Sequence, residues 1–449
     1  MDANLQSASS PTKFDLILPH QFEPRNYQLP ALRALDSGIK RAVAVWHRRA
    51  GKEKTFLNHT VKAAFQRIGT YFYIFPTYAQ GKKILWQGMD RDGFPFMAHI
   101  PEAIRKKKLE DEMRVELING SAFQIIGSDK IDSIVGTNPV GCVFSEYSLQ
   151  DPRAWDYLRP ILRENGGWAI FDFTPRGKNH GYQIYQMAKD NPEWFCQMLT
   201  IDDTGVMNDA DIDAERRAGM SEEMIQQEFY CSFEGVMFGA YFGNEMRQVE
   251  AEGRITRVPY EPGIGVETWW DLGINDSMTI WFTQTIGREV RVIDYYESSG
   301  EGLAHYAKYL QGLPYIYGAH HAPHDIEVRE LGTGRSRREV AREYGINFDV
   351  VPNLPLEDGI EAARTFLGRC WFDKEKCERG INALRSYRKD YDEKNEVFKA
   401  RPVHDWASHG ADAFRYLAVG HKIAVKQRAE KVEVVQYKAG SESIAWMGM

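Results

Sequence analysis

The first half of the chain alternates short runs of β-branched and aromatic residues with segments of helical periodicity. The strand candidates are residues 41–46, 70–75, 122–126, 141–144 and 168–173. Apolar strands that alternate with helices are typical of a largely parallel sheet. We therefore expect an α/β domain over residues 1–240.

A glycine-lysine loop follows the first of these strands. Residues 47–55 are His-Arg-Arg-Ala-Gly-Lys-Glu-Lys-Thr, and the apolar residues of the next helix fall on one face. Such a loop suits a nucleotide phosphate, because N–H groups at the helix start point at the anion and Lys52 adds a positive charge. The alternative is an ordinary strand, turn and helix with solvated basic side chains. The residues expected at the nucleotide are Arg48, Arg49, Ala50, Gly51, Lys52, Glu53, Lys54 and Thr55.

The loop departs from the pattern GxxxxGK[ST] at two positions. Trp46 stands in place of the first glycine, and Glu53 stands in place of the hydroxyl residue that binds Mg²⁺. Thr55 is one possible substitute for that hydroxyl.

Three segments elsewhere in the first half supply further nucleotide contacts. Tyr27 is expected to stack on adenine, and Gln28 to hydrogen-bond its edge. Glu146 follows the strand 141–144, where a water-activating base would lie near the γ-phosphate, although Ser145 replaces the Asp that usually precedes it. Thr174 follows the strand 168–173 and is expected to sense the γ-phosphate. The alternative for Glu146 is a surface carboxylate at a strand end.

The pattern changes after the turn residues 261–265. Three strands in quick succession, 266–272, 278–284 and 289–296, predict an antiparallel meander, and helices then alternate with strands. This is the order of a ribonuclease H-like domain, expected over residues 266–424. Residues 241–265 are then a linker, and 425–449 a tail.

Carboxylates at strand ends predict a second site. Asp271 ends the first strand of this domain, Asp325 ends a later strand candidate, and a helix carries His409 and Asp412 on one face. Hydrolysis of a phosphodiester by two metals needs oxygen ligands around two ions about 3.5–4 Å apart. We expect Asp271, Asp325 and Asp412 to be those ligands and His409 to assist, with Asp294 a weaker candidate.

Each of these assignments has a plainer alternative. Asp412 could form a surface ion pair with Arg415, and the histidines of 320–324 could be solvated loop residues. Residues 329–338 carry four arginines and two glycines, which suit contacts with DNA phosphates. The plainer alternative is a loop whose arginines are simply exposed to solvent.

Composition limits the class of partner. There are 56 Lys and Arg against 63 Asp and Glu, a formal net charge of −7, so any DNA contact must be a local patch. The five cysteines lack metal-binding spacing and are expected to be reduced. The first residues lack an apolar leader, and no run approaches the roughly 18 apolar residues of a membrane span, so we expect no membrane association.

The order and spacing of these motifs resemble the large terminase subunits of tailed bacteriophages. The segments that carry the resemblance are NYQLPALRAL (26–35), WHRRAGKEKT (46–55), FPTYAQGKKILW (75–86), GCVFSEY (141–147) and FDFTPRG (171–177), together with the second-half carboxylates.

The resemblance implies a P-loop (RecA/ASCE-like) packaging ATPase joined to an RNase H-like nuclease. Such a protein would use ATP and Mg²⁺, with Mn²⁺ also serving the nuclease. It would translocate double-stranded DNA into a procapsid and cut concatemers. The implied partners are the small terminase subunit, the portal protein and further copies of the chain in a ring, expected to be a pentamer. The implied location is the host cytoplasm, outside the finished virion.

Two other readings remain open on the sequence. A helicase-like repair or restriction protein could pair the same ATPase core with a nuclease, but residues 201–266 are too few for a second RecA-like domain. A degenerate P-loop scaffold is the other, because Glu53 and Ser145 depart from the expected metal ligands.

Overall fold

The computed structural model describes residues 16–133, 136–235, 237, 239–273, 277–329, 334–392 and 397–430. The chain divides into two compact units, the first formed by Met1–Gly243 and Arg385–Trp406, the second by Asn244–Leu384 and Ala407–Met449. The expected end of the first domain at residue 240 lies close to this division. Residues 385–406, which the sequence placed in the second domain, belong to the first unit.

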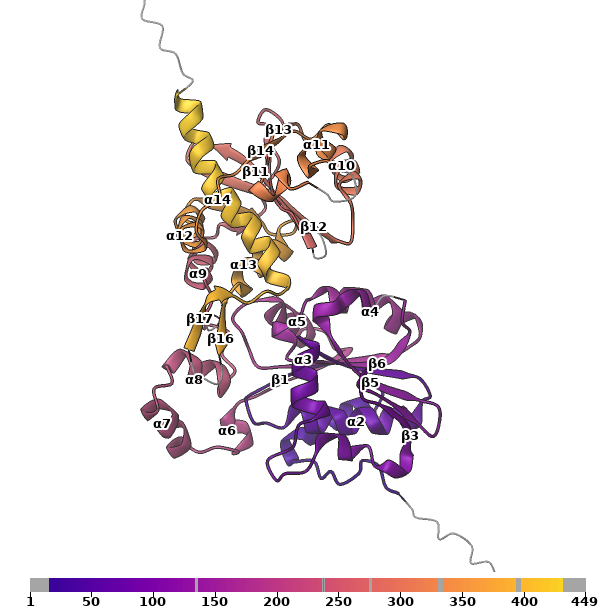
Figure 1. The fold of residues 1–449 in the computed structure, drawn as a ribbon. Helices are drawn as coiled ribbons and strands as arrows, with labels where there is room; N and C mark the ends of the chain where they lie inside the picture. Colours follow the sequence, from indigo (N-terminus) through magenta and orange to yellow (C-terminus); the bar gives the residue numbers. More distant parts are fainter. Residues whose placement is uncertain are drawn as a thin grey trace, which may run out of the picture. The chain divides into compact units, whose positions relative to one another are not determined.

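The first unit is built on an eight-stranded sheet with the order β3-β4-β5-β2-β6-β7-β1-β8 (Figure 1). The six strands β5, β2, β6, β7, β1 and β8 run parallel to one another. Strands β4 and β3 extend the sheet beyond β5 in antiparallel pairing. The strands are β1 (Arg41–Trp46), β2 (Thr70–Phe75), β3 (Arg105–Leu109), β4 (Arg114–Leu117), β5 (Ala122–Gly127), β6 (Pro139–Ser145), β7 (Trp168–Phe173) and β8 (Trp194–Leu199).

Helices cover both faces of this sheet, which explains why its central strands are continuous apolar runs. One face packs on α1 (Leu29–Asp36) and α2 (Lys52–Gln66). The other packs on α4 (Arg153–Glu164) and α5 (His180–Lys189) (Figure 1). The smaller helices of this part are η1 (Asn26–Gln28), α3 (Tyr78–Gly81), η2 (Lys82–Trp86), η3 (Phe96–His99), η4 (Glu102–Ile104), η5 (Ser128–Ser133) and η6 (Tyr147–Leu149).

Three short helices after β8 form a small core of their own. They are α6 (Ile201–Thr204), α7 (Asp209–Arg217) and α8 (Glu222–Glu228), and Ile212, Ile225 and Phe229 are among the residues packed between them. The side chains of Asn208 and Ser221 cap α7 and α8, so both helices begin where a polar residue accepts a backbone N–H. The hairpin β16 (Lys389–Asp392) and β17 (Val397–Pro402) also belongs to the first unit.

The second unit contains a seven-stranded sheet with the order β14-β13-β10-β11-β12-β15-β9. Strands β10, β11 and β12 form the expected antiparallel meander, and β13 and β14 continue parallel to β10. This is the strand order of an RNase H-like domain, so the expected fold class is confirmed for both halves. The strands are β9 (Ile255–Thr256), β10 (Val266–Asp271), β11 (Ser277–Ile286), β12 (Glu289–Ser299), β13 (Tyr317–Ala322), β14 (Phe348–Val350) and β15 (Cys370–Asp373).

Helices also cover both faces of the second sheet. One face packs on α10 (Leu303–Gly312) and α11 (Arg337–Glu343) (Figure 1). On the other, Phe414 of the long helix α14 (Trp406–Glu430) contacts the ring of Trp281. The remaining helices of this part are α9 (Gly243–Ala251), η7 (His324–Glu327), α12 (Leu356–Leu367) and α13 (Glu378–Ser386).

Three further differences from the sequence expectation lie in the second half of the chain. The strand expected to end near Asp325 is β13, which ends at Ala322, and Pro323 starts the turn of η7 that carries Asp325. The span expected as a linker holds α9 and β9, and β9 pairs with β15. Helix α14 continues to Glu430, and residues 431–449 of the expected tail lie outside the described residues.

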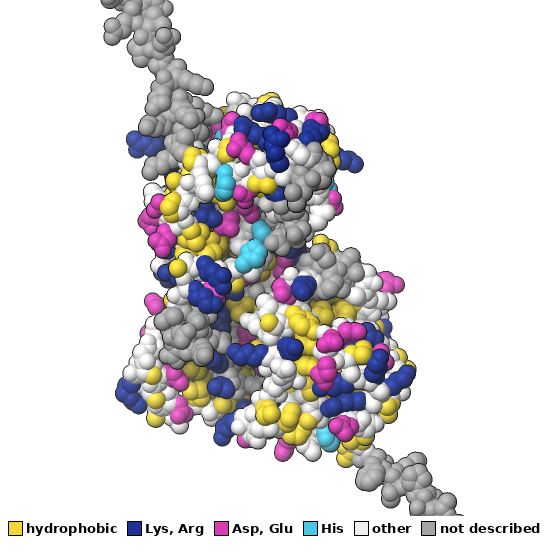
Figure 2. All heavy atoms as spheres, viewed as in Figure 1, with side chains coloured by type: hydrophobic (Ala, Val, Ile, Leu, Met, Phe, Trp, Pro, Cys, Tyr) yellow, Lys and Arg dark blue, Asp and Glu magenta, His cyan; other side chains and the backbone are white. Residues whose placement is uncertain are grey.

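All five cysteines are free, and four of them are buried. No helix among the described residues is long and apolar enough to cross a membrane. On the face shown in Figure 2, basic and acidic side chains are mixed over each unit.

A glycine in α13 provides a test of the second core. A Cβ atom at Gly380 would overlap the ring of Trp281, whereas a Cβ at Gly312, in α10, would meet nothing within 4 Å. Gly380→Ala is therefore expected to lower the free energy of unfolding by about 1–3 kcal/mol through overpacking. Gly312→Ala, the matched control, should leave it unchanged or raise it by up to about 1 kcal/mol. Calorimetry on both variants checks this, and equal melting temperatures would contradict the packing described.

Candidate functional site

The glycine-lysine loop, residues 47–51, joins the buried end of β1 to the start of α2. We call it the P-loop. Arg49 and Gly51 both have positive φ angles, 74° and 83°, so the backbone turns sharply before the helix begins. Arg48 and Arg49 are exposed, and Ala50 is buried. The N–H groups at the start of α2 are thereby presented at the loop, as an anion site requires.

Lys52 is buried at the base of this loop. Its Nζ donates hydrogen bonds to the Trp46 carbonyl at 3.2 Å and to Thr174 Oγ1 at 3.1 Å. Glu146 Oε1 lies 3.4 Å from the same nitrogen. The structure thus brings together three residues that the sequence selected separately: Lys52, Glu146 and Thr174.

Carboxylates set the charge state of Lys52. Burial alone lowers the pKa of the ammonium group, but Glu146, Glu53 and Asp172 together raise it above its ordinary value. The Thr174 backbone N–H also points at Glu146 Oε2 at 3.4 Å. Glu146 has a positive φ of 52° and lies directly after the last residue of β6, so the turn carries its side chain back over the P-loop.

Glu53 lies on the first turn of α2 and faces the sheet. Ser145 Oγ is 3.5 Å from Glu53 Oε1. Burial raises the pKa of Glu53, Lys52 lowers it, and Glu146 raises it further. The two departures from the usual motif, Glu53 and Ser145, therefore face each other.

Asp172, two residues before Thr174, is a site residue that was not predicted from the sequence. It is fully buried and lies opposite Ser145 in the register of β6 and β7. Burial raises its pKa well above the ordinary value; the charges of Glu53 and Glu146 raise it further, and Lys52 lowers it. A charged residue inside the apolar run 168–173 was the available signal, because an unpaired buried carboxylate is costly.

Thr55 and Lys54, which were also expected to contact the nucleotide, bond to other groups of the protein. Thr55 Oγ1 donates to the Gly51 carbonyl at 2.9 Å, and Lys54 pairs with Asp90 at 2.6 Å. The hydroxyl of Thr55 is thus turned to the backbone of its own helix.

Tyr27 and Gln28 brace the loop from the other side. Gln28 is buried, and its Nε2 donates to the Ala50 carbonyl at 2.9 Å while its Oε1 accepts from the Arg25 N–H at 3.0 Å. The Tyr27 hydroxyl lies 3.3 Å from the same Ala50 carbonyl. Both polar ends of the Gln28 side chain are therefore occupied within the protein.

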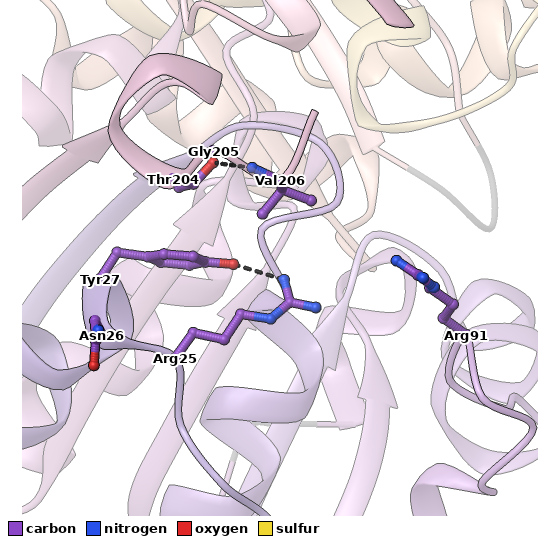
Figure 3. Close-up of a pocket in the computed structure, with 7 residues that line it drawn as sticks. All are labelled: Arg25, Asn26, Tyr27, Arg91, Thr204, Gly205 and Val206. Atoms are coloured by element: carbon purple, nitrogen blue, oxygen red, sulfur yellow. Dashed lines mark hydrogen bonds between the residues drawn. The ribbon is translucent and has the colours of Figure 1, made fainter. Parts of the chain in front are cut away.

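A cavity of about 390 Å³ opens beside Tyr27 (Figure 3). Arg25, Arg91 and residues 204–206 are among its lining, and the Arg25 guanidinium donates to the Tyr27 hydroxyl at 2.6 Å. Because Tyr27 also contacts Ala50, the cavity adjoins the P-loop.

Glu228, in α8, is a second residue that sequence reasoning missed. Its buried carboxylate pairs with Arg176, two residues after Thr174, and lies 4.0 Å from Arg48. Its carbonyl accepts the Arg48 N–H at 2.8 Å. Burial raises the pKa of Glu228, but Arg176 outweighs that effect and lowers it below its ordinary value. The P-loop, the segment after β7 and the small helices are joined through this residue, and no local sequence signal marks it.

In the second unit, Asp271 and His409 meet at the end of β10. His409 Nδ1 is 3.1 Å from Asp271 Oδ2. The first turns of α14 are held against β11, because Thr279 Oγ1 and Trp281 Nε1 donate to the carbonyls of His409 and Gly410 at 3.0 and 2.8 Å. These bonds fix His409 beside the last residue of β10.

Asp412 carries a second carboxyl group, and its charge acts on Asp271. Burial raises the pKa of Asp271, the hydrogen bond from His409 lowers it, and the charge of Asp412 raises it again. Asp412 Oδ1 also accepts from Arg415 at 3.0 and 2.8 Å. The ion pair that the sequence offered as the plainer alternative is thus present.

Asp325 and Asp294 each have another partner. Asp325 is about half exposed in η7 and pairs with His324 at 3.0 Å. Asp294 accepts the Tyr315 hydroxyl at 2.8 Å on the buried side of β12. Among the described residues, which leave out 274–276, no group of three His, Cys, Asp or Glu side chains is placed to hold a metal. Burial raises the pKa of Tyr416, in α14, and the charges of Asp271, Asp412 and Asp325 all raise it further. The assignment of these three aspartates as metal ligands stays a prediction.

The arginines of 329–338 are engaged with the protein where they are described. Arg335 pairs with Glu343, and Arg338 pairs with Glu327 at 3.0 Å. Part of this segment, 330–333, lies outside the described residues.

Neither a protein-family model nor a curated protein matches the sequence. Solved structures do match. The large terminase of a thermophilic bacteriophage, in complex with ADP, aligns with 88% of this chain and 98% of its own at 15% identity and a TM-score of 0.40. The large terminase ATPase domain of a Thermus phage covers 48% of this chain and 99% of its own, at 20% identity and a TM-score of 0.41.

A third match is the large terminase nuclease domain of bacteriophage SPP1 with bound Mn. It covers 35% of this chain and 86% of its own, at 16% identity and a TM-score of 0.28. All three TM-scores lie below 0.5. A function for this chain therefore has to be argued from the chemistry of its own side chains. The chain is similar in structure to bacteriophage large terminases over about 88% of its length.

Proposed function

We propose that this chain is a terminase large subunit: an ATP-driven motor that moves double-stranded DNA into a procapsid and cuts it with a metal-dependent nuclease. The observation that carries the proposal is the meeting of Lys52, Glu146 and Thr174 within 3.4 Å at the ends of three neighbouring strands. The same chain carries an RNase H-like unit with an Asp271–His409 contact. The motif order along the sequence supports the choice of terminase among ATPase-nucleases.

In the ATPase unit, each residue has a role that its position supports. Lys52 would turn from Glu146 to the β- and γ-phosphates, and the N–H groups of 49–52 would bind the same phosphates. Glu146, released from the ammonium, would orient the attacking water. Thr174, hydrogen-bonded to Lys52, would respond to the presence of the γ-phosphate.

The cavity beside Tyr27 would take the base and ribose. The Tyr27 ring supplies a stacking face, and the cavity adjoins the loop that holds the phosphates (Figure 3). Gln28, whose amide is used by Ala50 and Arg25, would act by positioning Tyr27 and the loop instead of hydrogen-bonding the base.

In the nuclease unit, Asp271 and Asp412 are the residues best placed to hold Mg²⁺ or Mn²⁺. Burial raises the pKa of Asp271 and the charge of Asp412 raises it further, and a divalent cation bound there would offset both effects. When bound, the metals would activate water and stabilise the leaving oxygen. His409 would orient Asp271 and hold a proton at Nδ1. Asp325 remains a proposed third ligand, which would have to turn from His324.

The helicase-like alternative is less well supported. In the described part of 201–265 the structure holds four short helices and the two-residue strand β9, and no second parallel-sheet domain. The proposed partners are double-stranded DNA, the small terminase subunit, the portal and further copies in a ring. A neighbouring copy would supply a cation to the ATPase site.

Two substitutions in the first unit test the ATPase. Lys52→Ala and Glu146→Gln should each lower the rate of phosphate release from ATP by about 100-fold or more. Glu146→Gln should still bind ADP, because the glutamate acts on water and not on the nucleotide. Lys62→Ala is the matched control, since this lysine lies on the same helix and pairs with Asp36 on the surface. A Lys52→Ala variant with the full rate would exclude this site.

Two substitutions in the second unit test the nuclease. Asp271→Asn and Asp412→Asn should each reduce Mn²⁺-dependent plasmid cleavage by about 100-fold or more, because each removes a charged metal ligand. Asp358→Asn, an exposed aspartate of α12, should cleave at the wild-type rate. Gel electrophoresis of plasmid products gives the readout. Cleavage that survives in either site variant would place the nuclease elsewhere.

A further inference from the structure

Among the described residues, Asp172 has no hydrogen-bond partner that explains its burial. Both carboxyl oxygens are inaccessible, and neither has a hydrogen-bond partner among the described residues. The Glu146 N–H lies near enough to affect the carboxyl group, though outside hydrogen-bond geometry. The Tyr73 hydroxyl on the neighbouring part of the sheet is buried and equally without a partner in the described part of the chain. An orphaned carboxylate is expensive, so such a group usually has a ligand.

The position of Asp172 matches the place that a metal at a P-loop would need. Strand β7 lies between β6 and β1, so Asp172 stands one strand nearer to the loop than Ser145 does. Asp172 is two residues beyond Ile170, and Ser145 two beyond Val143, on the sheet face that packs on α2. Glu53, on the first turn of α2, contacts Ser145 from above.

The usual P-loop divides its protein ligands to Mg²⁺ between a helix hydroxyl and a strand carboxylate. Here the helix position carries the carboxylate Glu53, and the strand position carries the hydroxyl Ser145. Two exchanged residues that touch each other, beside an orphaned aspartate, form a set of oxygen donors of the kind Mg²⁺ prefers.

We propose that Glu53 and Asp172, with Ser145 between them, bind the Mg²⁺ that accompanies the nucleotide in this chain. Asp172 takes over the charge that Ser145 lacks, and Glu53 replaces the missing helix hydroxyl. Thr55, the substitute considered from sequence, keeps its bond to the Gly51 carbonyl. The proposal rests on nucleotide binding at the P-loop, and it assigns ligands that the P-loop pattern does not.

The test compares ADP binding with and without Mg²⁺. A fluorescent ADP analogue is titrated into the full chain in EDTA and again in saturating Mg²⁺. The wild-type protein is expected to bind the analogue about tenfold more tightly or better with Mg²⁺, and Asp172→Asn and Glu53→Gln should each lose most of that gain. Both substitutions keep the shape of the side chain and remove its charge.

The control is Asp151→Asn, which neutralises another buried aspartate of the same unit, one that is paired with Arg153. This variant should keep the full Mg²⁺ effect. Binding in EDTA shows that each variant is folded, and Glu53→Gln serves if Asp172→Asn does not fold.

The outcomes separate the two proposals. If the wild-type chain binds no ADP either in EDTA or in saturating Mg²⁺, the nucleotide site itself is wrong. If ADP binds but Mg²⁺ has no effect, or if both variants keep the wild-type gain, then Glu53 and Asp172 are not the metal ligands and the nucleotide site stands.

Discussion

The burial of the Lys52 ammonium is the constraint on which the first unit depends. A buried charge must be paired, and Lys52 is held by a backbone carbonyl, the Thr174 hydroxyl and the Glu146 carboxylate. These partners come from the ends of β1, β7 and β6, so the pairing requires the parallel sheet to be in register. Glu146 holds the same ammonium that a phosphate would bind. A ligand that binds the Lys52 ammonium would therefore release Glu146 from it and alter the hydrogen bond between Lys52 and Thr174.

Negative charge exceeds positive charge around that ammonium. Glu146, Glu53 and Asp172 all act on one lysine, and the pKa values of Glu53 and Asp172 are both raised. Such a site favours a bound cation or a shared proton over a fully ionised state without one. In the second unit, burial raises the pKa of Asp271, and the charge of Asp412 raises it further. Both proposed metal sites are therefore places where burial, together with the charge of other carboxylates, makes an ionised carboxylate costly.

Much of the architecture follows from sequence patterns alone. Strands β1, β2 and β7 have the predicted bounds, because fully buried parallel strands are apolar runs with polar residues or turns at both ends. Strand β3 was not predicted, since its sequence, RKKKL, is basic and its pairing with β4 depends on the tertiary sheet edge. Asp325 was expected at a strand end, but Pro323 ends the pairing early and moves the residue into η7. Local sequence pattern predicted only some of the residues of the candidate sites. Lys52 and Glu146 follow strand ends, where local pattern is informative, whereas Asp172 and Glu228 act through partners that only the folded sheet and small helices bring near.

If ATP turnover drives this chain along duplex DNA, the rate of ATP hydrolysis depends on the kind of DNA present. The most direct measurement is the steady-state rate of ATP hydrolysis by the purified chain alone, with linear double-stranded DNA, and with single-stranded DNA of the same sequence. We expect duplex DNA to raise the rate and single-stranded DNA to raise it less. A rate that responds only to single-stranded DNA, or no ATP hydrolysis under any of these conditions, would contradict it.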